Sequence, residues 1–241
     1  QFFTGDTMDS VMNYKLSDAI MRFVMGGKAQ DSDDVLTQLR QNYPKQALYN
    51  LMNIVDSHDT ARAIYAYGGG KDGVVQAQKT DFDYALGKAR LKMAAVFELG
   101  YPGMPTIYYG DEAGLVGYAD PFNRGTYPWG RADTGLRECI RQMAALRNGN
   151  SALSAGELEP LVCAAGMAAW RRRDETGEFI ICVNPGEGPL PLPDAAPRSA
   201  RGFTAEGKLT KTKWLLILGV CALFGFISLP YPVGIGGLSF L

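Results

Sequence analysis

Histidine is almost absent from this chain, and its few cysteines are spaced too far apart for a usual zinc site. The one histidine is His58, and the cysteines Cys139, Cys163, Cys182 and Cys221 include no C-x-x-C pair. The common zinc sets are therefore excluded, and we expect neither a metal site nor a cofactor. We expect the cysteines to be reduced, mostly buried thiols. The alternative that Cys163 and Cys182 face each other on neighbouring strands stays open.

An excess of charge is also missing, since 24 Lys and Arg residues balance 25 Asp and Glu residues. Without a basic field to hold a phosphate backbone, nucleic acid is excluded as a partner class. The chain begins with Gln1 rather than Met and carries no signal peptide, so we expect a piece of a longer protein. Its 241 residues, 46% of them hydrophobic, suffice for one large domain or two small ones.

Residues 1–150 alternate short apolar runs with helical periodicity. Strands are predicted over residues 10–14, 51–55 and 106–109, and helices over residues 17–25, 33–42, 83–99 and 134–148. Ser32 is the expected N-cap of the second helix, and Gly100 is expected to close the third. Strands that alternate with helices indicate parallel βαβ units. Three such units are too few to close a barrel, so we predict an α/β fold that is part of something larger.

The sequence pattern changes near residue 150, from alternating strands and helices to short strands separated by turns. Short strands are predicted over residues 157–163, 167–173 and 179–184, with turns at residues 165–166 and 175–177. This spacing is typical of an antiparallel meander, and we assign residues 151–207 to a second, all-β domain. A proline-rich stretch over residues 185–197 is expected to be a loop or linker.

Residues 208–241 form an apolar tail. Lys208, Lys211 and Lys213 precede an uncharged run from Trp214 to Leu241. As a helix, residues 214–229 would be about 24 Å long, against a hydrocarbon thickness of roughly 30 Å. The tail is either a short membrane span or foreign sequence, and in both cases we expect it to lie outside the fold of the preceding domains. A span would place the lysines, and the domains before them, on the cytoplasmic side; we predict a cytoplasmic location in either case.

Two polar clusters follow predicted strands. The first is Asp56-Ser57-His58-Asp59-Thr60, directly after residues 51–55. In α/β barrels the loops at the carboxyl ends of strands carry the functional groups. An ionised carboxylate accepts two hydrogen bonds from vicinal hydroxyls, so Asp59 beside His58 suits a sugar. The alternative is that Asp59 caps a helix and His58 is a core residue.

The second cluster starts at Tyr108-Tyr109-Gly110-Asp111-Glu112 and runs through Asp120 and Arg124 to Trp129. Aromatic faces beside an acid and an arginine suit sugar binding. In the alternative interpretation Asp120 and Arg124 form a salt bridge that shapes the loop, and both interpretations can hold together. We expect Asp111 and Glu112 to pair with backbone or arginine and not to act in catalysis.

Three segments resemble the α-amylase family (glycoside hydrolase family 13). "NIVDSHDTAR" (residues 53–62) is similar to the family's segment at the end of the seventh barrel strand, and "GYPGMPTIYYGDEAGLVGYADPFNRGTYPW" (residues 100–129) to that around the eighth. "GDTMDSVMNY" (residues 5–14) resembles the segment just after the acid-bearing strand. The meander resembles the family's C-terminal β-sandwich. "DSVMNY" and the D-P-x-x-R loop look most like neopullulanases, cyclomaltodextrinases and maltogenic amylases.

The resemblance implies a role for each matching residue. Asp59 corresponds to the third invariant carboxylate, which holds sugar hydroxyls at the cleavage point, and His58 to a histidine on the same sugar. Asp120 and Arg124 correspond to a substrate-binding pair on the non-reducing side. The implied reaction is retaining hydrolysis of α-glucosidic bonds in maltooligosaccharides or cyclodextrins. Such enzymes need a nucleophile and an acid roughly 5 Å apart.

The family's nucleophile segment, of G-x-R-x-D type, and its acid-bearing segment do not occur in this sequence. We therefore expect an incomplete C-terminal part of a (β/α)8 TIM barrel (residues 1–150), a truncated antiparallel β-sandwich (151–207) and the apolar tail (208–241). The chain alone should be inactive. A non-catalytic sugar-binding remnant and a membrane-tethered fusion are the alternatives. Neopullulanase-like enzymes often dimerise through an N-terminal domain, so a homodimeric parent is expected.

Overall fold

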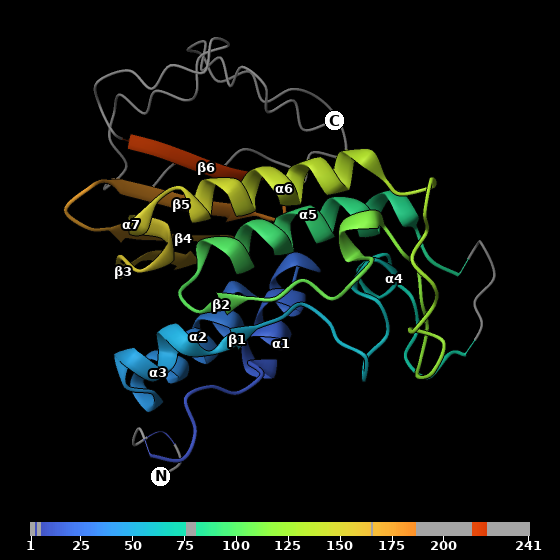
Figure 1. Ribbon diagram of the computed structural model, residues 1–241, viewed down its shortest axis with the longest axis horizontal. Helices are drawn as coiled ribbons and strands as arrows, with labels where there is room; N and C mark the ends of the chain where they lie inside the picture. Colours follow the sequence, from blue (N-terminus) through green and yellow to red (C-terminus); the bar gives the residue numbers. More distant parts are fainter. Residues whose placement is uncertain (1–2, 4–5, 76–80, 165, 187–213, 221–241) are drawn as a thin grey trace.

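The computed structural model describes residues 3, 6–75, 81–164, 166–186 and 214–220. In the first part of the chain (Figure 1), the elements are α1 (Tyr14–Val24), α2 (Ala29–Asn42), α3 (Lys45–Asn50), β1 (Met52–Asn53), α4 (Ala63–Tyr67), α5 (Tyr84–Gly100), β2 (Met104–Pro105), the 3-10 helix η1 (Asp111–Ala113) and α6 (Thr134–Asn148). They are followed by α7 (Ser151–Ser154), β3 (Glu157–Ala164), β4 (Met167–Arg173), β5 (Glu178–Asn184) and β6 (Trp214–Val220). Helices α5 and α6 lie side by side along the β3–β6 sheet.

Three segments from separate parts of the chain run parallel and adjacent. Met12 bridges Met52 in parallel, and β1 pairs with β2 in parallel through Met52 and Met104. The predicted βαβ arrangement is therefore confirmed, although its strands are shorter than expected. The predicted strand over residues 106–109 is wrong in position, because the β2 pairing ends at Pro105. Its β-branched and aromatic residues favour a strand, but the register is set by backbone hydrogen bonds to β1.

Helices α1, α5 and α6 begin and end close to their predicted limits, whereas α2 begins at Ala29, before the predicted start, and α3 and α4 were not predicted. The Asp133 side chain accepts a hydrogen bond from the Leu136 N–H at 2.9 Å, so α6 begins at Thr134 as expected. The predicted cap of α2 is wrong: Ser32 lies inside that helix and is buried. Its hydroxyl donates to the Ala19 carbonyl of α1 at 3.0 Å. A short hydroxyl side chain is thus used to join two helices and not to start one.

The strands β3, β4 and β5 form the expected antiparallel meander, and it packs on the end of α5. The Phe97 and Trp170 ring centroids are 4.6 Å apart, and the Trp170 indole N–H donates to the Gly100 carbonyl at 3.0 Å. Ile181 belongs to the same hydrophobic core. The core is therefore continuous across residue 150. The second sheet of a sandwich and the limits at residues 150 and 207 stay predictions.

The strand order corrects one expectation about the cysteines. Because β4 lies between β3 and β5, Cys163 and Cys182 are not on neighbouring strands. Cys139, Cys163 and Cys182 are free thiols, and burial raises the pKa of the first two to about 11 and that of Cys182 to about 12. Raised pKa values keep these thiols protonated and unreactive. Cys221 lies outside the described residues.

Part of the apolar tail joins the sheet as an edge strand. Trp214–Val220 forms β6 and pairs in parallel with the whole of β5, from Glu178 opposite Trp214 to Asn184 opposite Val220. The expectation that this run lies outside the fold is wrong for these seven residues. An edge strand presents unpaired N–H and C=O groups that an extended apolar segment can complete, whatever its side-chain alternation. The rest of the tail lies outside the described residues, among which no helix has the length and apolar character to cross a membrane.

Beneath β2, Glu98 of α5 is a buried acid whose protonation is tied to folding. Its Oε1 accepts a hydrogen bond from the Thr106 N–H at 3.1 Å. Burial raises the pKa of Glu98 to about 8, while that hydrogen bond and the charge of Arg147 act in the opposite direction. A carboxyl in an unfolded chain titrates near pH 4.3. The folded protein therefore holds this proton more tightly than the unfolded chain does.

This difference predicts a loss of stability with rising pH. The contribution of Glu98 is fully present below about pH 4.3 and is lost as the pH rises through about 8. We expect Glu98→Gln, which keeps the acceptor and removes the titration, to flatten the fall in urea midpoint between about pH 5 and about pH 8. Glu138→Gln, at an exposed site, is the control and should leave that fall unchanged. An equally steep fall in Glu98→Gln would contradict the assignment.

Candidate functional site

The loop after β1 is a tight turn that presents two polar side chains to solvent. The Ser57 N–H donates to the Thr60 hydroxyl at 3.0 Å, and the Asp59 N–H to the Ser57 hydroxyl at 3.1 Å. The side chains of His58 and Asp59 are 51% and 60% exposed. The alternative of a core histidine is therefore wrong, and the first N–H of α4 is bonded to Asp56 and not to Asp59.

The capping role belongs to Asp56, which is buried below the same turn. Its Oδ2 accepts a hydrogen bond from the Ala63 N–H, the first residue of α4, at 2.6 Å. Sequence alone could not separate the two aspartates, because they stand three residues apart and both precede a helix. The tertiary structure places one inside the protein and the other in solvent.

The loop after β2 carries the second predicted cluster. Arg124 Nε lies 2.7 Å from Asp120 Oδ1, so the predicted salt bridge is confirmed. Asp111 pairs with Arg62 at 3.1 Å, and Glu112 accepts from the Gly110 N–H at 2.9 Å. Both acids therefore pair with arginine or backbone, as expected.

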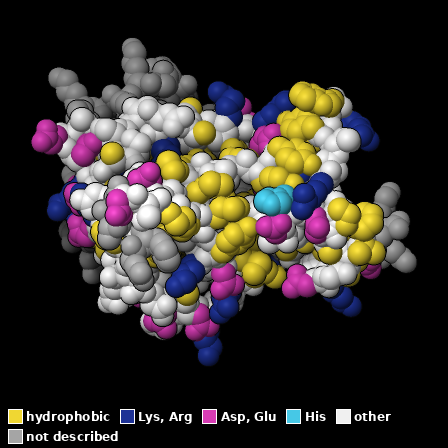
Figure 2. Space-filling view, turned by 60° about the horizontal axis from the view of Figure 1, so that its bottom comes forward, with side chains coloured by type: hydrophobic (Ala, Val, Ile, Leu, Met, Phe, Trp, Pro, Cys, Tyr) yellow, Lys and Arg dark blue, Asp and Glu magenta, His cyan; other side chains and the backbone are white. Residues whose placement is uncertain are grey.

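The two loops bring all four predicted site residues into one line of ion pairs. His58 Nε2 lies 3.2 Å from Asp59 Oδ1, and the same oxygen lies 3.9 Å from Arg124 Nη2. Arg124 continues the line to Asp120. Figure 2 shows the single cyan imidazole on the surface with basic and acidic side chains next to it. The line offers alternating hydrogen-bond donors and acceptors to solvent, as the hydroxyls of a sugar require.

Exposed aromatic rings belong to the same loop system. Tyr109, Phe122 and Trp129 are exposed, Trp129 at 83%. The Tyr127 and Trp129 ring centroids are 4.6 Å apart, so one ring supports the other. Such faces can stack on the apolar face of a sugar ring.

Arg62, which was not predicted as a site residue, joins the two loops from inside. It is fully buried; its Nε donates to the Asn123 carbonyl at 2.8 Å, and its guanidinium carbon lies 3.9 Å from the Tyr108 ring centroid. Its Nη1 bonds both Asp111 and the Tyr109 carbonyl. Arg62 ends the first quoted motif, but its partners lie more than 45 residues further along the chain. No local pattern identifies such a role.

The two acids buried next to Arg62 have raised pKa values. Burial and the neighbouring Asp56 carboxyl raise the pKa of Asp111 well above its usual range, while Arg62 lowers it. Burial also raises the pKa of Asp56, while the Ala63 N–H and the charge of Arg62 lower it. Both groups are buried. Their carboxyl groups are therefore shielded from solvent, unlike the exposed side chains of His58 and Asp59.

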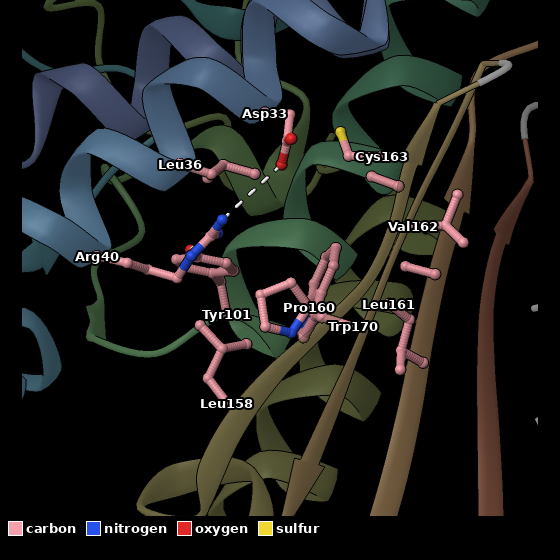
Figure 3. A pocket seen from close by; sticks show the side chains of 12 residues that line it. Asp33, Leu36, Arg40, Tyr101, Leu158, Pro160, Leu161, Val162, Cys163 and Trp170 are labelled. Atoms are coloured by element: carbon pink, nitrogen blue, oxygen red, sulfur yellow. Dashed lines mark hydrogen bonds and ion pairs between the residues drawn. The ribbon is translucent and has the colours of Figure 1, made fainter. Parts of the chain in front are cut away.

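A cavity of about 170 Å³ lies elsewhere, between α2 and the β3–β4 hairpin. Figure 3 shows Arg40 and Asp33 of α2 on one wall, with Tyr101 and Trp170 beside them. None of the four predicted site residues lines it. Within the described ranges no cluster of three or more His, Cys, Asp or Glu side chains is placed to hold a metal ion.

Comparison with known proteins places the site in context. Residues 1–156, well over half of the chain, match the family described as alpha amylase, catalytic domain. An amylopullulanase from Thermoanaerobacter thermohydrosulfuricus is 38% identical over 76% of this chain and 14% of its own length. Neopullulanase 2 from Thermoactinomyces vulgaris is 35% identical over 64% of this chain and 24% of its own length.

A solved cyclomaltodextrinase structure superimposes with a TM-score of 0.63 at 31% identity, covering 75% of this chain and 29% of that one. This chain thus spans less than a third of each of these relatives. The described fold is part of an α/β barrel, and the resemblance to neopullulanases and cyclomaltodextrinases is confirmed. The chain belongs to the α-amylase family of glycoside hydrolases.

Proposed function

We propose that this chain is the C-terminal part of a retaining hydrolase of α-glucosidic bonds. In this proposal Asp59 and His58 contact the sugar at the cleaved bond, and Asp120 and Arg124 bind a sugar on the non-reducing side. The observation that carries the proposal is the exposed line of ion pairs from His58 to Asp120, at the carboxyl ends of parallel segments. In α/β barrels that end of the strands is where reactions take place.

The proposed substrates are maltooligosaccharides and cyclodextrins. The names of the relatives refer to amylose-type glucans, pullulan and cyclomaltodextrins. The exposed groups suit such ligands, because a glucan offers hydroxyls to ion-paired side chains and apolar ring faces to aromatic residues. Trp129 and Tyr127 are the aromatic pair available for the second kind of contact.

Asp59 fits the role of an electrostatic group better than that of a proton donor. Glycoside cleavage develops positive charge on the sugar, as in an oxocarbenium ion. A fixed carboxylate stabilises that charge most strongly once the substrate has displaced water from around it. His58 Nε2 and Arg124 Nη2 lie on either side of Asp59, and both contact its Oδ1. The other carboxylate oxygen then remains for the sugar.

The nucleophile and the acid are proposed to come from a preceding barrel segment. The family's G-x-R-x-D segment and its acid-bearing segment do not occur in residues 1–241. The buried acids Asp56 and Asp111 are poor substitutes, since neither is exposed to a substrate. A covalent glycosyl intermediate needs an accessible nucleophile.

Because the nucleophile and the acid are proposed to come from another segment, we predict that the 241-residue chain alone releases no reducing sugar from maltohexaose or β-cyclodextrin. Joined to the barrel segment that carries the nucleophile and acid, the same residues should support turnover. Reducing-sugar assays on both forms check this, with Asp59→Ala as the control in each. Activity of the chain alone that survives Asp59→Ala would contradict the proposal. Sugar binding by the joined form without any turnover would favour a non-catalytic sugar-binding protein.

Three expectations about the parent protein stay predictions: a cytoplasmic location, homodimerisation through an N-terminal domain, and membrane attachment only if the tail is a genuine span. Fractionation of a fusion with a reporter after Leu241 tests the membrane attachment. The pairing of Trp214–Val220 with β5 argues against a span that begins at Trp214.

A further inference from the structure

Asn123 stands between Asp120 and Arg124 in sequence, yet its side chain points away from both and into the loop after β1. The residue is fully buried. Its Nδ2 lies 2.7 Å from the His58 carbonyl and 2.6 Å from the Thr60 carbonyl, with the Ser57 carbonyl at 3.5 Å. A carboxamide has two N–H donors, which is the number that the two short bonds need. The amide therefore holds the loop that carries Asp59 from both sides of that residue.

The backbone of Asn123 is fixed as firmly as its side chain. Its carbonyl accepts from Arg62 Nε at 2.8 Å, and the Arg62 N–H donates to the Gly117 carbonyl at 3.1 Å. A Cβ at Gly117 would lie 2.7 Å from the Asn123 Cα and 2.8 Å from the Arg62 Cγ. Only glycine permits this close approach. Asn123 is thus held between a buried arginine and a tightly packed turn.

We propose that Asn123 is a positioning residue that sets the distance between Asp59 and Arg124. The inference rests on the proposed function of those two side chains. Their contact is 3.9 Å long and about half exposed, and such a surface ion pair is too weak to fix two loops by itself. The buried hydrogen bonds of Asn123 are costly to leave unmade, so they determine how the loops lie.

The chemistry of the side chain makes this role specific to an amide. Aspartate at position 123 would direct carboxylate oxygens at the carbonyls of His58 and Thr60, where both partners are acceptors. Alanine would leave those carbonyls without the donor that they have now. In either case the turn that presents Asp59 is free to shift, and a displacement of about 1 Å in a catalytic group can reduce the rate by about 100-fold.

The test uses the enzyme joined to its preceding barrel segment and a double-mutant cycle. We expect Asn123→Asp and Asn123→Ala to lower kcat on maltohexaose by at least about 10-fold with little change in KM. In an Asp59→Asn background the further loss should shrink to less than about 2-fold, because the residue being positioned is then already removed. Asn150→Asp is the matched control, since Asn150 Nδ2 donates to the Leu146 carbonyl at 2.6 Å away from the site. It should leave kcat unchanged in both backgrounds.

An equal loss in both backgrounds would overturn the proposal, because it would show a structural effect that does not act through Asp59. If Asp59→Asn itself leaves kcat intact, the proposed function fails. The positioning role of Asn123 is then tested by the position of the His58–Thr60 turn alone. Crystal structures should show the His58–Thr60 turn displaced from Arg124 in Asn123→Ala, and an unmoved turn would refute the inference. If the aspartate variant does not fold, Asn123→Ser, which keeps one donor, replaces it and should show an intermediate loss.

Discussion

Asp59→Asn in the joined enzyme is expected to lower kcat by about 100- to 1000-fold, the usual range when one preorganised electrostatic contact is lost. Asparagine has the same shape as aspartate but no charge, so it cannot stabilise the positive charge that develops on the sugar. Because the contact strengthens in the transition state, kcat and kcat/KM should fall together. Steady-state kinetics on maltohexaose measures both constants. Because the side chain is 60% exposed, we expect the substitution to leave the stability of the fold unchanged.

Arg124→Ala is the matched comparison, since it removes another charged side chain from the same line of ion pairs. Arg124 is proposed to bind a sugar remote from the cleaved bond, so this variant should raise KM and leave most of kcat. Near-full turnover in Asp59→Asn would contradict the assignment of Asp59. Equal loss of kcat in both variants would remove the proposed distinction between the two residues.

Arg62→Met is expected to reduce the free energy of unfolding by about 3–5 kcal/mol, the cost of removing one partner from a buried ion pair. Methionine fills a similar volume but leaves Asp111 without its 3.1 Å partner and the Asn123 carbonyl without its donor. For a protein part of this size the loss corresponds to a fall in Tm of roughly 10 °C. Thermal unfolding followed by circular dichroism measures it.

The control for this substitution is Arg141→Met. Arg141 pairs with Glu138 on α6, but its side chain is 66% exposed. Solvent already screens that pair, so we expect no measurable change in Tm. A small effect of Arg62→Met, similar to that of Arg141→Met, would show that the buried network does not stabilise the site loops.

Prediction from the sequence succeeded where a signal is local. Helix α6 and strand β4 begin and end at their predicted residues. The cap at Asp133 and the Gly-containing turns on both sides of β4 each depend on only a few adjacent residues. The four proposed site residues were singled out for a related reason, and their roles stay predictions. They lie in short motifs that follow strands, and strand ends in such folds carry functional groups.

Prediction failed where a residue's partner lies far along the chain. Ser32 has the composition of an N-cap, but its hydroxyl bonds a carbonyl of α1. The strand expected over residues 106–109 gave way to Met104–Pro105, because pairing with β1 sets the register. The tail segment Trp214–Val220 lacks strand alternation, yet it completes the free edge of β5. Each outcome depends on a contact that no local pattern contains.

The sequence by itself determined the family, the α/β character of residues 1–150 and the identity of the four exposed groups, because motifs and periodicity are local properties. Only the tertiary structure decided that these groups form one line, that Asp56 is buried while Asp59 is exposed, and that Arg62 and Asn123 hold the two loops together. The physical reason is that a buried polar group must find a hydrogen-bond partner wherever the fold places one. For Arg62 and Asn123 those partners lie 47 to 65 residues away in sequence, at the carboxyl end of a different strand.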